Sequence, residues 1–232
     1  RTAVRRNIKY GADLIKTCST GGVLSKGTKV GAPQYTVEEL TALVDEAHSR
    51  GLKVASHAHG AQGIINALHA GADTIEHASF IDEEGIRLAI ANNAALSMDI
   101  YVTEYILGEG AGAGILEESL EKERMTGSTQ RANFRKAVEA GATVVYGTDA
   151  GVYPHGQNAR QFSRMVRFGM TPLQAIQSAT VTAADVMGLG YEVGKIEAGY
   201  AADFVAVKGN PLESIELLEE PAAVIKGGVR YR

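Results

Sequence analysis

Two apolar segments in the first third of the chain each end in a histidine. Residues 52–57 read L-K-V-A-S-H and residues 73–77 read D-T-I-E-H, and the segment between them, 61–70, has apolar residues at helical spacing. Strands of a parallel sheet that is buried on both faces are apolar along their length instead of alternating. The pattern therefore predicts a strand, a helix and a second parallel strand, with His57 and His77 at neighbouring strand ends.

The same pattern recurs along the chain and predicts an α/β fold. We expect five strands, each followed by helical sequence, at residues 12–17, 52–57, 73–77, 94–100 and 143–148. Helices are predicted at residues 36–50, 61–70, 82–90, 115–124, 128–140, 158–168, from 171 onwards and at 182–187. Their starts carry capping residues, such as Thr36 with Glu39 three positions later and Thr171 before Pro172.

From Gly194 the helical spacing disappears and the sequence reads as β. A strand is predicted in G-K-I-E-A-G-Y-A-A-D-F-V-A-V, and the last residues form a hairpin that turns at Gly227-Gly228. We therefore divide the chain into a barrel part, residues 1–190, and a small β part, residues 191–232. Eight strand–helix units close a barrel in roughly 250 residues, so five units predict strands four to eight of a (β/α)8 barrel.

The start of the chain supports this partial barrel. The chain opens with R-T-A-V-R-R-N-I-K-Y, without methionine, on what resembles the tail of a helix. We therefore expect an N-terminally incomplete chain. The glycine-rich segment 108–114 is predicted to be a flexible loop, either a mobile lid or a linker.

Composition and charge exclude several classes of protein. The 45% apolar and 22% charged residues are ordinary for a globular domain. The net charge of −4 gives no electrostatic case for binding nucleic acid or an anionic membrane, and no apolar run approaches the roughly 20 residues of a membrane span. The single cysteine, Cys18, excludes an internal disulfide and a cysteine-based zinc cluster. The compartment stays open, with the cytoplasm favoured over export.

Polar side chains at the strand ends predict a metal site. Asp149 follows strand 143–148, and the carboxyl ends of parallel strands meet at one edge. One strand-end histidine alone is more often a structural loop residue, but two of them with a carboxylate suit a divalent metal such as zinc. Lys16 also ends a strand and is expected to be half-buried, which lowers the pKa of an ammonium group. A neutral amine can take up CO2 as a carbamate, and its two oxygens can bridge a pair of metals.

Four motifs extend this interpretation. G-A-D-L-I-K-x-C-x-T-G-G, S-H-A-H-G, T-I-E-H-A-S and G-T-D-A-G, in this order, resemble the amidohydrolase superfamily. The closest branch is the imidazolonepropionase-like group, which contains Xaa-Pro dipeptidases and related metallo-carboxypeptidases. The tail is similar to the β-sandwich segment that follows the barrel in that family, so the resemblance covers nearly the whole chain.

The resemblance implies roles for individual residues. Lys16 would be the carbamylated lysine, His57, His77 and Asp149 would be metal ligands, and Asp149 would also shuttle the proton. His57 and His59 are two apart and can face one side; by the resemblance His57 is the ligand and His59 lies near the substrate. The family's H-x-H pair from strand one does not occur in the chain. This favours a fragment of a longer enzyme over a polypeptide unable to build the whole site.

The implied activity is metal-dependent hydrolysis of amide or peptide C–N bonds, in dipeptides or N-acyl amino acids. Tyr101 would bind the substrate carboxylate or the developing oxyanion, although an ordinary aromatic residue at the rim is an equally good interpretation. His155 would contact substrate, although a plain loop histidine is an equally good interpretation. Two alternatives stay open: a cyclic amide hydrolase of the imidazolonepropionase type, and a non-catalytic fragment or pseudoenzyme. The expected partner is a small amide or peptide, and a homo-oligomer is left open.

Overall fold

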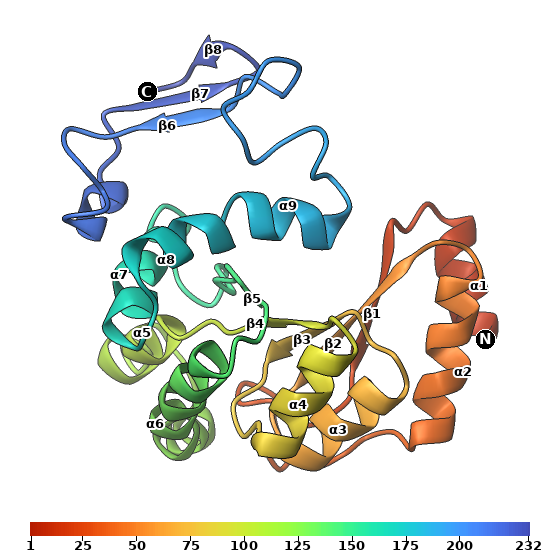
Figure 1. Ribbon diagram of the computed structural model, residues 1–232. Helices are drawn as coiled ribbons and strands as arrows, with labels where there is room; N and C mark the ends of the chain where they lie inside the picture. The colour runs from red at the N-terminus through yellow and green to blue at the C-terminus, as the bar shows by residue number, and fades with distance from the viewer.

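The computed structural model describes residues 1–232, and a parallel sheet of five strands lies at its centre (Figure 1). The strand order is β1-β2-β3-β4-β5, so strands that follow one another in the chain are also neighbours in the sheet. The strands are β1 (Leu14–Cys18), β2 (Lys53–Ala58), β3 (Thr74–His77), β4 (Ala95–Ser97) and β5 (Val144–Val145). This arrangement confirms the predicted α/β class, because sequential parallel strands with helical connections are the repeating unit of a barrel.

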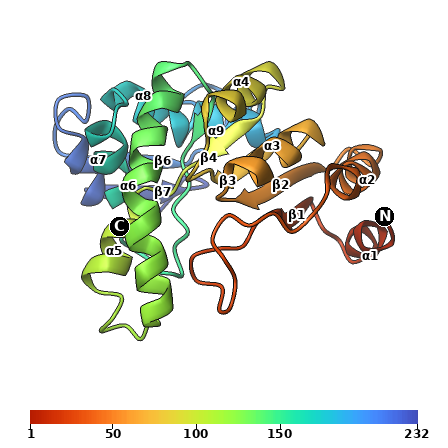
Figure 2. The same ribbon diagram turned by 90° about the horizontal axis from the view of Figure 1, so that it is seen from below.

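Helices connect the strands and cover one face of the sheet. Their bounds are α1 (Thr2–Lys9), α2 (Val37–His48), α3 (Ala61–His69), α4 (Glu83–Ala91), α5 (Val102–Gly108), α6 (Glu117–Glu139), α7 (Arg160–Arg167), α8 (Pro172–Ser178) and α9 (Val181–Met187). In Figure 2, α2, α3 and α4 lie together on the same side of β1 to β3. None of these helices has both the length and the apolar composition that a membrane span requires.

The helix starts form as the sequence predicts. Thr36 accepts a hydrogen bond from the backbone N–H of Glu39, whose side chain accepts one from the backbone of Thr36, and Thr171 forms the same box with Gln174. Asp82 caps α4 by accepting from the N–H of Gly85 at 2.8 Å. Such caps satisfy backbone donors that have no partner inside the helix, and each contributes about 1 kcal/mol to stability.

The core lies between the sheet and the helices. It is built from apolar side chains of successive strands and of the helices packed on them, including Ile15, Val54, Ile75, Leu96, Val144, Leu40, Val44, Ile64, Leu68, Ile86 and Phe134. Burial of this apolar surface stabilises the sheet by roughly 25 cal/mol per Å². It also holds the carboxyl ends of all five strands, and the polar residues that follow them, at one edge.

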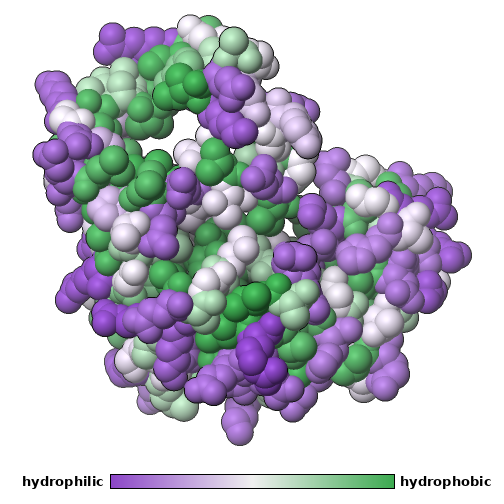
Figure 3. Space-filling view, in the orientation of Figure 1, coloured by the Kyte–Doolittle hydropathy of each residue, from purple (hydrophilic) through white to green (hydrophobic).

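A small antiparallel sheet follows the helices. The 3-10 helix η1 (Ile215–Glu219) lies in the connection between its first two strands in the chain. Its strands are β6 (Phe204–Ala206), β7 (Ala223–Lys226) and β8 (Val229–Arg230), in the order β6-β7-β8. The hairpin turn carries positive φ at Gly227 (56°) and Gly228 (78°), as a tight two-residue turn requires. Figure 3 shows a hollow between this sheet and the helices, with apolar side chains along it. The predicted hairpin is confirmed, while the domain boundary at residue 190 stays a prediction.

The prediction of two helices at residues 115–124 and 128–140 is wrong. A single helix, α6, runs through both ranges. Glycine is a poor helix former and suggested a break at Met125-Thr126-Gly127. Gly127 is instead buried inside α6 and faces α5, and a Cβ at this position would meet Cγ2 of Thr103 at 2.3 Å. The glycine allows α5 and α6 to approach closely and does not end a helix.

The predicted strand at residues 94–100 is also shorter than expected. β4 ends at Ser97, and residues 102–108, which the pattern left without a helix, form α5. Met98, Asp99 and Ile100 are buried although they lie outside the strand. The apolar character of this segment therefore reflects its burial and not a longer strand. The shortening moves Asp99 from the middle of a strand to the edge where strands end.

We expect Gly127→Ala to lower the free energy of unfolding by about 1–3 kcal/mol, because a new methyl group would be forced against Thr103. Helix propensity alone predicts the opposite sign, a gain of roughly 0.5–1 kcal/mol. Urea unfolding of the full-length protein measures the difference. Ser128→Ala, at the next and exposed position, is the control and should stay within about 0.5 kcal/mol. A gain of stability in Gly127→Ala would show that α5 and α6 are not closely packed.

Candidate metal centre

A cavity of about 250 Å³ lies at the carboxyl edge of the sheet, where the strand ends converge. Lys16 of β1, His57 of β2 and His77 of β3 line it, and Asp149 reaches it from the segment after β5. In the register of the sheet, Cys18 pairs with His57 and Ala58 pairs with His77. Neighbouring strands therefore bring residues that are distant in sequence to one wall of the cavity.

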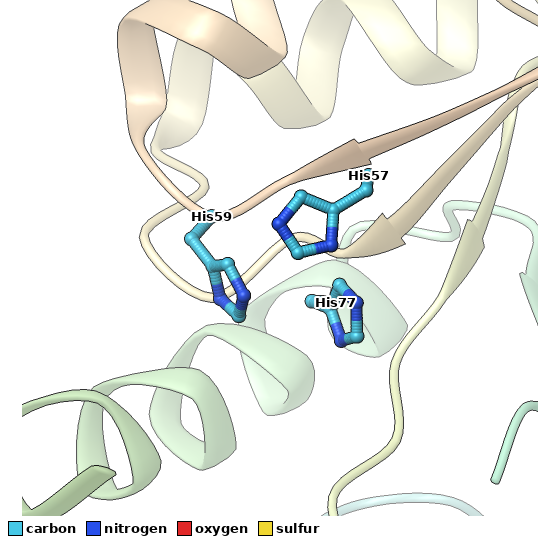
Figure 4. Close-up of side chains that lie close together, drawn as sticks. All are labelled: His57, His59 and His77. Carbon is cyan, nitrogen blue, oxygen red and sulfur yellow. The ribbon is translucent and has the colours of Figure 1, made fainter. Parts of the chain in front are cut away.

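Three imidazoles cluster in this cavity. The ring centroids of His57, His59 and His77 are separated by 4.6–4.8 Å, and Figure 4 shows the rings gathered together at the carboxyl ends of β2 and β3. One nitrogen of each ring lies within 4.8 Å of the others. His59 is buried, its Nδ1 lies 2.8 Å from the Ser79 hydroxyl, and its backbone N–H donates to Thr20.

The protonation of these rings suits a cation. Burial, together with the charges of His77 and Lys16, lowers the pKa of His57 to about 4. Burial and the two neighbouring imidazoles hold the pKa of His59 well below its usual range. Both rings are therefore neutral at pH 7 and keep a lone pair free, which is the form that binds zinc. The donor set fits a divalent metal.

Asp99 joins the site through His77. Its Oδ1 lies 2.9 Å from Nδ1 of His77 and accepts a hydrogen bond of 3.1 Å from Nε2 of Gln130. The same Gln130 amide donates to the backbone carbonyl of His77 at 3.2 Å. Burial lowers the pKa of His77, but the charge and hydrogen bond of Asp99 outweigh it, so that the pKa is raised. Asp99 thus holds the proton on Nδ1 and leaves Nε2 for a ligand, the usual arrangement behind a metal-binding histidine.

The backbone is strained at two of the predicted ligands. His77 has φ of 68° and Asp149 has φ of 50°, in the left-handed region that non-glycine residues rarely adopt. Such conformations cost about 1–3 kcal/mol each and gather at functional sites. His77, Asp99 and Asp149 each place one ligand atom within 4.8 Å of the other two. Two of these three converging residues, His77 and Asp149, are thus the ones with strained backbone.

The glycine loop after β1 closes one side of the cavity. A Cβ on Gly22 would lie 3.0 Å from the ring of His57, so only glycine lets the loop pass this close. The neighbouring Val23, Leu24 and Ser25 also line the cavity. The prediction that the Gly-Gly segment allows a close backbone approach at the site is consistent with this contact.

Comparison with known proteins follows this geometry. The model of the Amidohydrolase family matches residues 1–230. The chain belongs to the amidohydrolase family. Members of this family are generally metal-dependent, in agreement with the donor set at the sheet edge.

Three relatives place this amidohydrolase within its family. It is 42% identical to a Xaa-Pro dipeptidase solved with methionine bound in the active site, with a TM-score of 0.94 over 100% of this chain and 57% of that one. It is 36% identical to the ochratoxinase of Aspergillus niger, over 100% of this chain and 49% of the relative. It is 26% identical to an imidazolonepropionase of a Geobacillus species, over 74% of this chain and 37% of the relative. The chain spans about half the length of the curated relatives it matches, and the predicted branch is confirmed.

Three residues of the amidohydrolase site differ from expectation. Lys16 is exposed and not half-buried, because β1 is the terminal strand of the sheet and the face that carries Lys16 is uncovered. Tyr101 is buried outside the cavity lining, where its hydroxyl donates to Gln157 at 2.9 Å and accepts from Arg160 at 3.0 Å. His155 is exposed and also lies outside the lining. The substrate roles of Tyr101 and His155 stay predictions that the cavity does not support.

Sequence reasoning missed two carboxylates of the cavity. Asp99 sat inside a predicted strand, and only its place in the apolar run A-A-L-S-M-D-I could have marked it as unusual. Glu123 belongs to E-E-S-L-E-K-E-R, which reads as a solvated helix face, yet it is 3% exposed. Its burial depends on the packing of α5 against α6, for which the sequence carries no signal.

We expect Asp99→Ala to weaken metal binding by about 10- to 100-fold, since His77 would lose the partner that orients its ring. Asp99→Asn, whose amide oxygen still accepts from Nδ1, should recover part of the loss. Metal titration of the full-length protein measures both. The control is Asp73→Ala, which removes a histidine–carboxylate pair of 2.8 Å with His48 outside the cavity. Equal affinities in the three variants would exclude a positioning role for Asp99.

Proposed function

We propose that this chain carries the metal centre of an amidohydrolase that cleaves amide or peptide C–N bonds in dipeptides or N-acyl amino acids. The observation that carries the proposal is the meeting of Lys16, His57, His77 and Asp149 in one cavity. The similarity to a Xaa-Pro dipeptidase with methionine in its active site supports a substrate built from amino acids.

The residues that would hold the metal are His57, His77 and Asp149, with Lys16 as a carbamate. We propose Zn²⁺ as the metal because nitrogen and carboxylate donors without cysteine suit it. A divalent metal bound there polarises the scissile carbonyl and makes water a nucleophile near neutral pH.

Asp149 is proposed to move the proton. Asp149 lines the cavity, and the partial desolvation of its carboxyl there, together with the charge of Asp99, raises the pKa of that carboxyl. As a carboxylate, Asp149 takes the proton of the attacking water and then gives it to the leaving amine, acting as base and then as acid. His59, held by Ser79, presents its free Nε2 toward the same space and is proposed to contact the substrate.

A panel of dipeptides tests the proposed function in the full-length, metal-loaded protein. We expect hydrolysis of dipeptides such as Met-Pro, and loss of turnover when the terminal carboxylate is amidated. Metal bound without hydrolysis of any amide would contradict the proposal and favour a non-catalytic protein. Hydrolysis restricted to cyclic amides would favour the second candidate, to which the similarity to an imidazolonepropionase points.

A further inference from the structure

Glu123 is a buried carboxylate without a partner in the cavity. It lies in the second turn of α6, it is 3% exposed, and it lines the same cavity as the histidines. Neither of its oxygens takes part in a hydrogen bond or an ion pair, and Oε1 is closed off from solvent. Buried carboxylates of folded proteins are almost always paired. Glu123 therefore lacks a cationic or hydrogen-bonding partner that its position requires.

The neighbours of Glu123 do not supply that partner. The hydroxyl of Thr103, on α5, is neutral and cannot balance the charge of a carboxylate. Arg131 donates instead to the carbonyl of Ile100 and to Glu104, at 3.2 and 3.4 Å. Burial raises the pKa of Glu123 to about 7, and no neighbouring group offsets this fully. A positive group entering the cavity would remove this cost.

Three carboxylates line the cavity, and the other two are engaged. Asp99 accepts from His77 and Gln130, while Asp149 lies with the proposed metal ligands. Of the three, only Glu123 has neither a hydrogen-bond partner nor a place among the proposed metal ligands. In a dipeptide the ammonium group sits one carbon from the scissile carbonyl. A group that binds the ammonium must therefore share a cavity with the groups that act on the carbonyl.

We propose that Glu123 receives the free amino terminus of the substrate and so makes the enzyme prefer unblocked dipeptides. The inference rests on the proposed function and adds the substrate class. A charge-assisted hydrogen bond is about twice as strong as a neutral one, and more so away from water. Val102, Ile106 and Val152 line the same cavity, so an apolar first residue fits beside the ammonium group.

Binding measured by calorimetry tests this assignment separately from turnover. In the full-length, metal-loaded protein we expect L-methionine to bind about tenfold more tightly than 4-(methylthio)butanoate, which lacks the amino group and contains no amide to cleave. This is the ratio that one charged hydrogen bond provides. Glu123→Gln keeps the side-chain volume and removes the charge, and it should abolish this preference. Glu123→Asp, which keeps the charge, should retain part of it. Glu121→Gln, at an exposed position of the same helix, should leave the ratio unchanged.

The outcomes separate the two proposals. An amine preference that persists in Glu123→Gln, or its absence from the wild type, would overturn the role of Glu123. Tight, Glu123-dependent binding of 6-aminohexanoate, which has a distal ammonium group but no α-amino group, would assign the carboxylate to a side-chain ammonium and overturn the amino-terminal assignment. Loss of the preference in Glu123→Gln, without hydrolysis of any dipeptide by the wild type, would uphold this inference and refute the proposed function. For hydrolysed dipeptides, kcat/KM for Met-Pro over N-acetyl-Met-Pro should fall with the binding ratio.

Discussion

Replacement of Asp149 by asparagine is expected to lower kcat for dipeptide hydrolysis by about 10²- to 10⁴-fold, the usual contribution of a general acid–base group. Asparagine keeps an oxygen at the ligand position but cannot take up the proton of the attacking water. The backbone should tolerate the change, because φ at this position is 50° and asparagine is among the residues that adopt this region most readily. Asp149→Asn therefore tests proton transfer without disturbing the fold.

The measurement combines three readouts on the full-length protein: kcat, metal content by elemental analysis, and the midpoint of thermal unfolding. We expect the first to fall steeply and the other two to stay near the wild-type values. Asp149→Ala serves as the comparison, since it removes the ligand oxygen as well and should also lower metal content. A nearly normal rate in Asp149→Asn would refute the proton-shuttle role.

Replacement of Lys16 by alanine is expected to reduce the metal bound per chain and to lower activity by several orders of magnitude. The reason is that Lys16, as a carbamate, would be one of the proposed metal ligands, so that its loss would weaken the hold of the site on metal. Lys16 lines the same cavity as His57 and His77, so a carbamate formed on it would share the cavity with the other proposed ligands. Elemental analysis of the full-length protein gives the number of metals directly.

Two further observations make this test specific to the carbamate. Addition of a short carboxylate such as propionate should restore part of the metal content of Lys16→Ala, because a carboxylate has the same pair of oxygens. Lys53→Ala, a lysine at the opposite end of the neighbouring strand that pairs with Asp73 at 3.7 Å, should behave as wild type. One metal per chain with or without Lys16 would indicate a mononuclear centre in which Lys16 is structural.

The two sets of residues at the site differ in how they reach it. His57, His77 and Asp149 come from strand ends or directly after them, and their convergence follows from the parallel order of the sheet. Asp99 and Glu123 come from the connection between β4 and β5. Variation in that connection can therefore change which substrates are accepted while the metal ligands stay in place, as is common for barrels with sites built on strand ends.

The sequence alone determined the five strands, most of the helices between them and the helix caps, and it named the metal ligands proposed here. These features depend on neighbours in the chain: apolar runs bury strands, Thr36 and Thr171 cap the helices that follow them, and histidines at the ends of consecutive strands share an edge. The physical basis is local, because hydrophobic spacing and backbone hydrogen bonding act over a few residues.

Only the tertiary structure decided where charged and aromatic side chains lie. The sequence suggested a helix end near Gly127, but the structure places this glycine inside α6 in close contact with Thr103. Hydrogen bonds to Gln157 and Arg160 hold Tyr101 outside the cavity. Glu123 looked solvated because its sequence neighbours are charged, yet the packing of α5 on α6 removes it from water. Whether a polar group is desolvated depends on segments far away in the chain, and hydrophobic spacing contains no information about them.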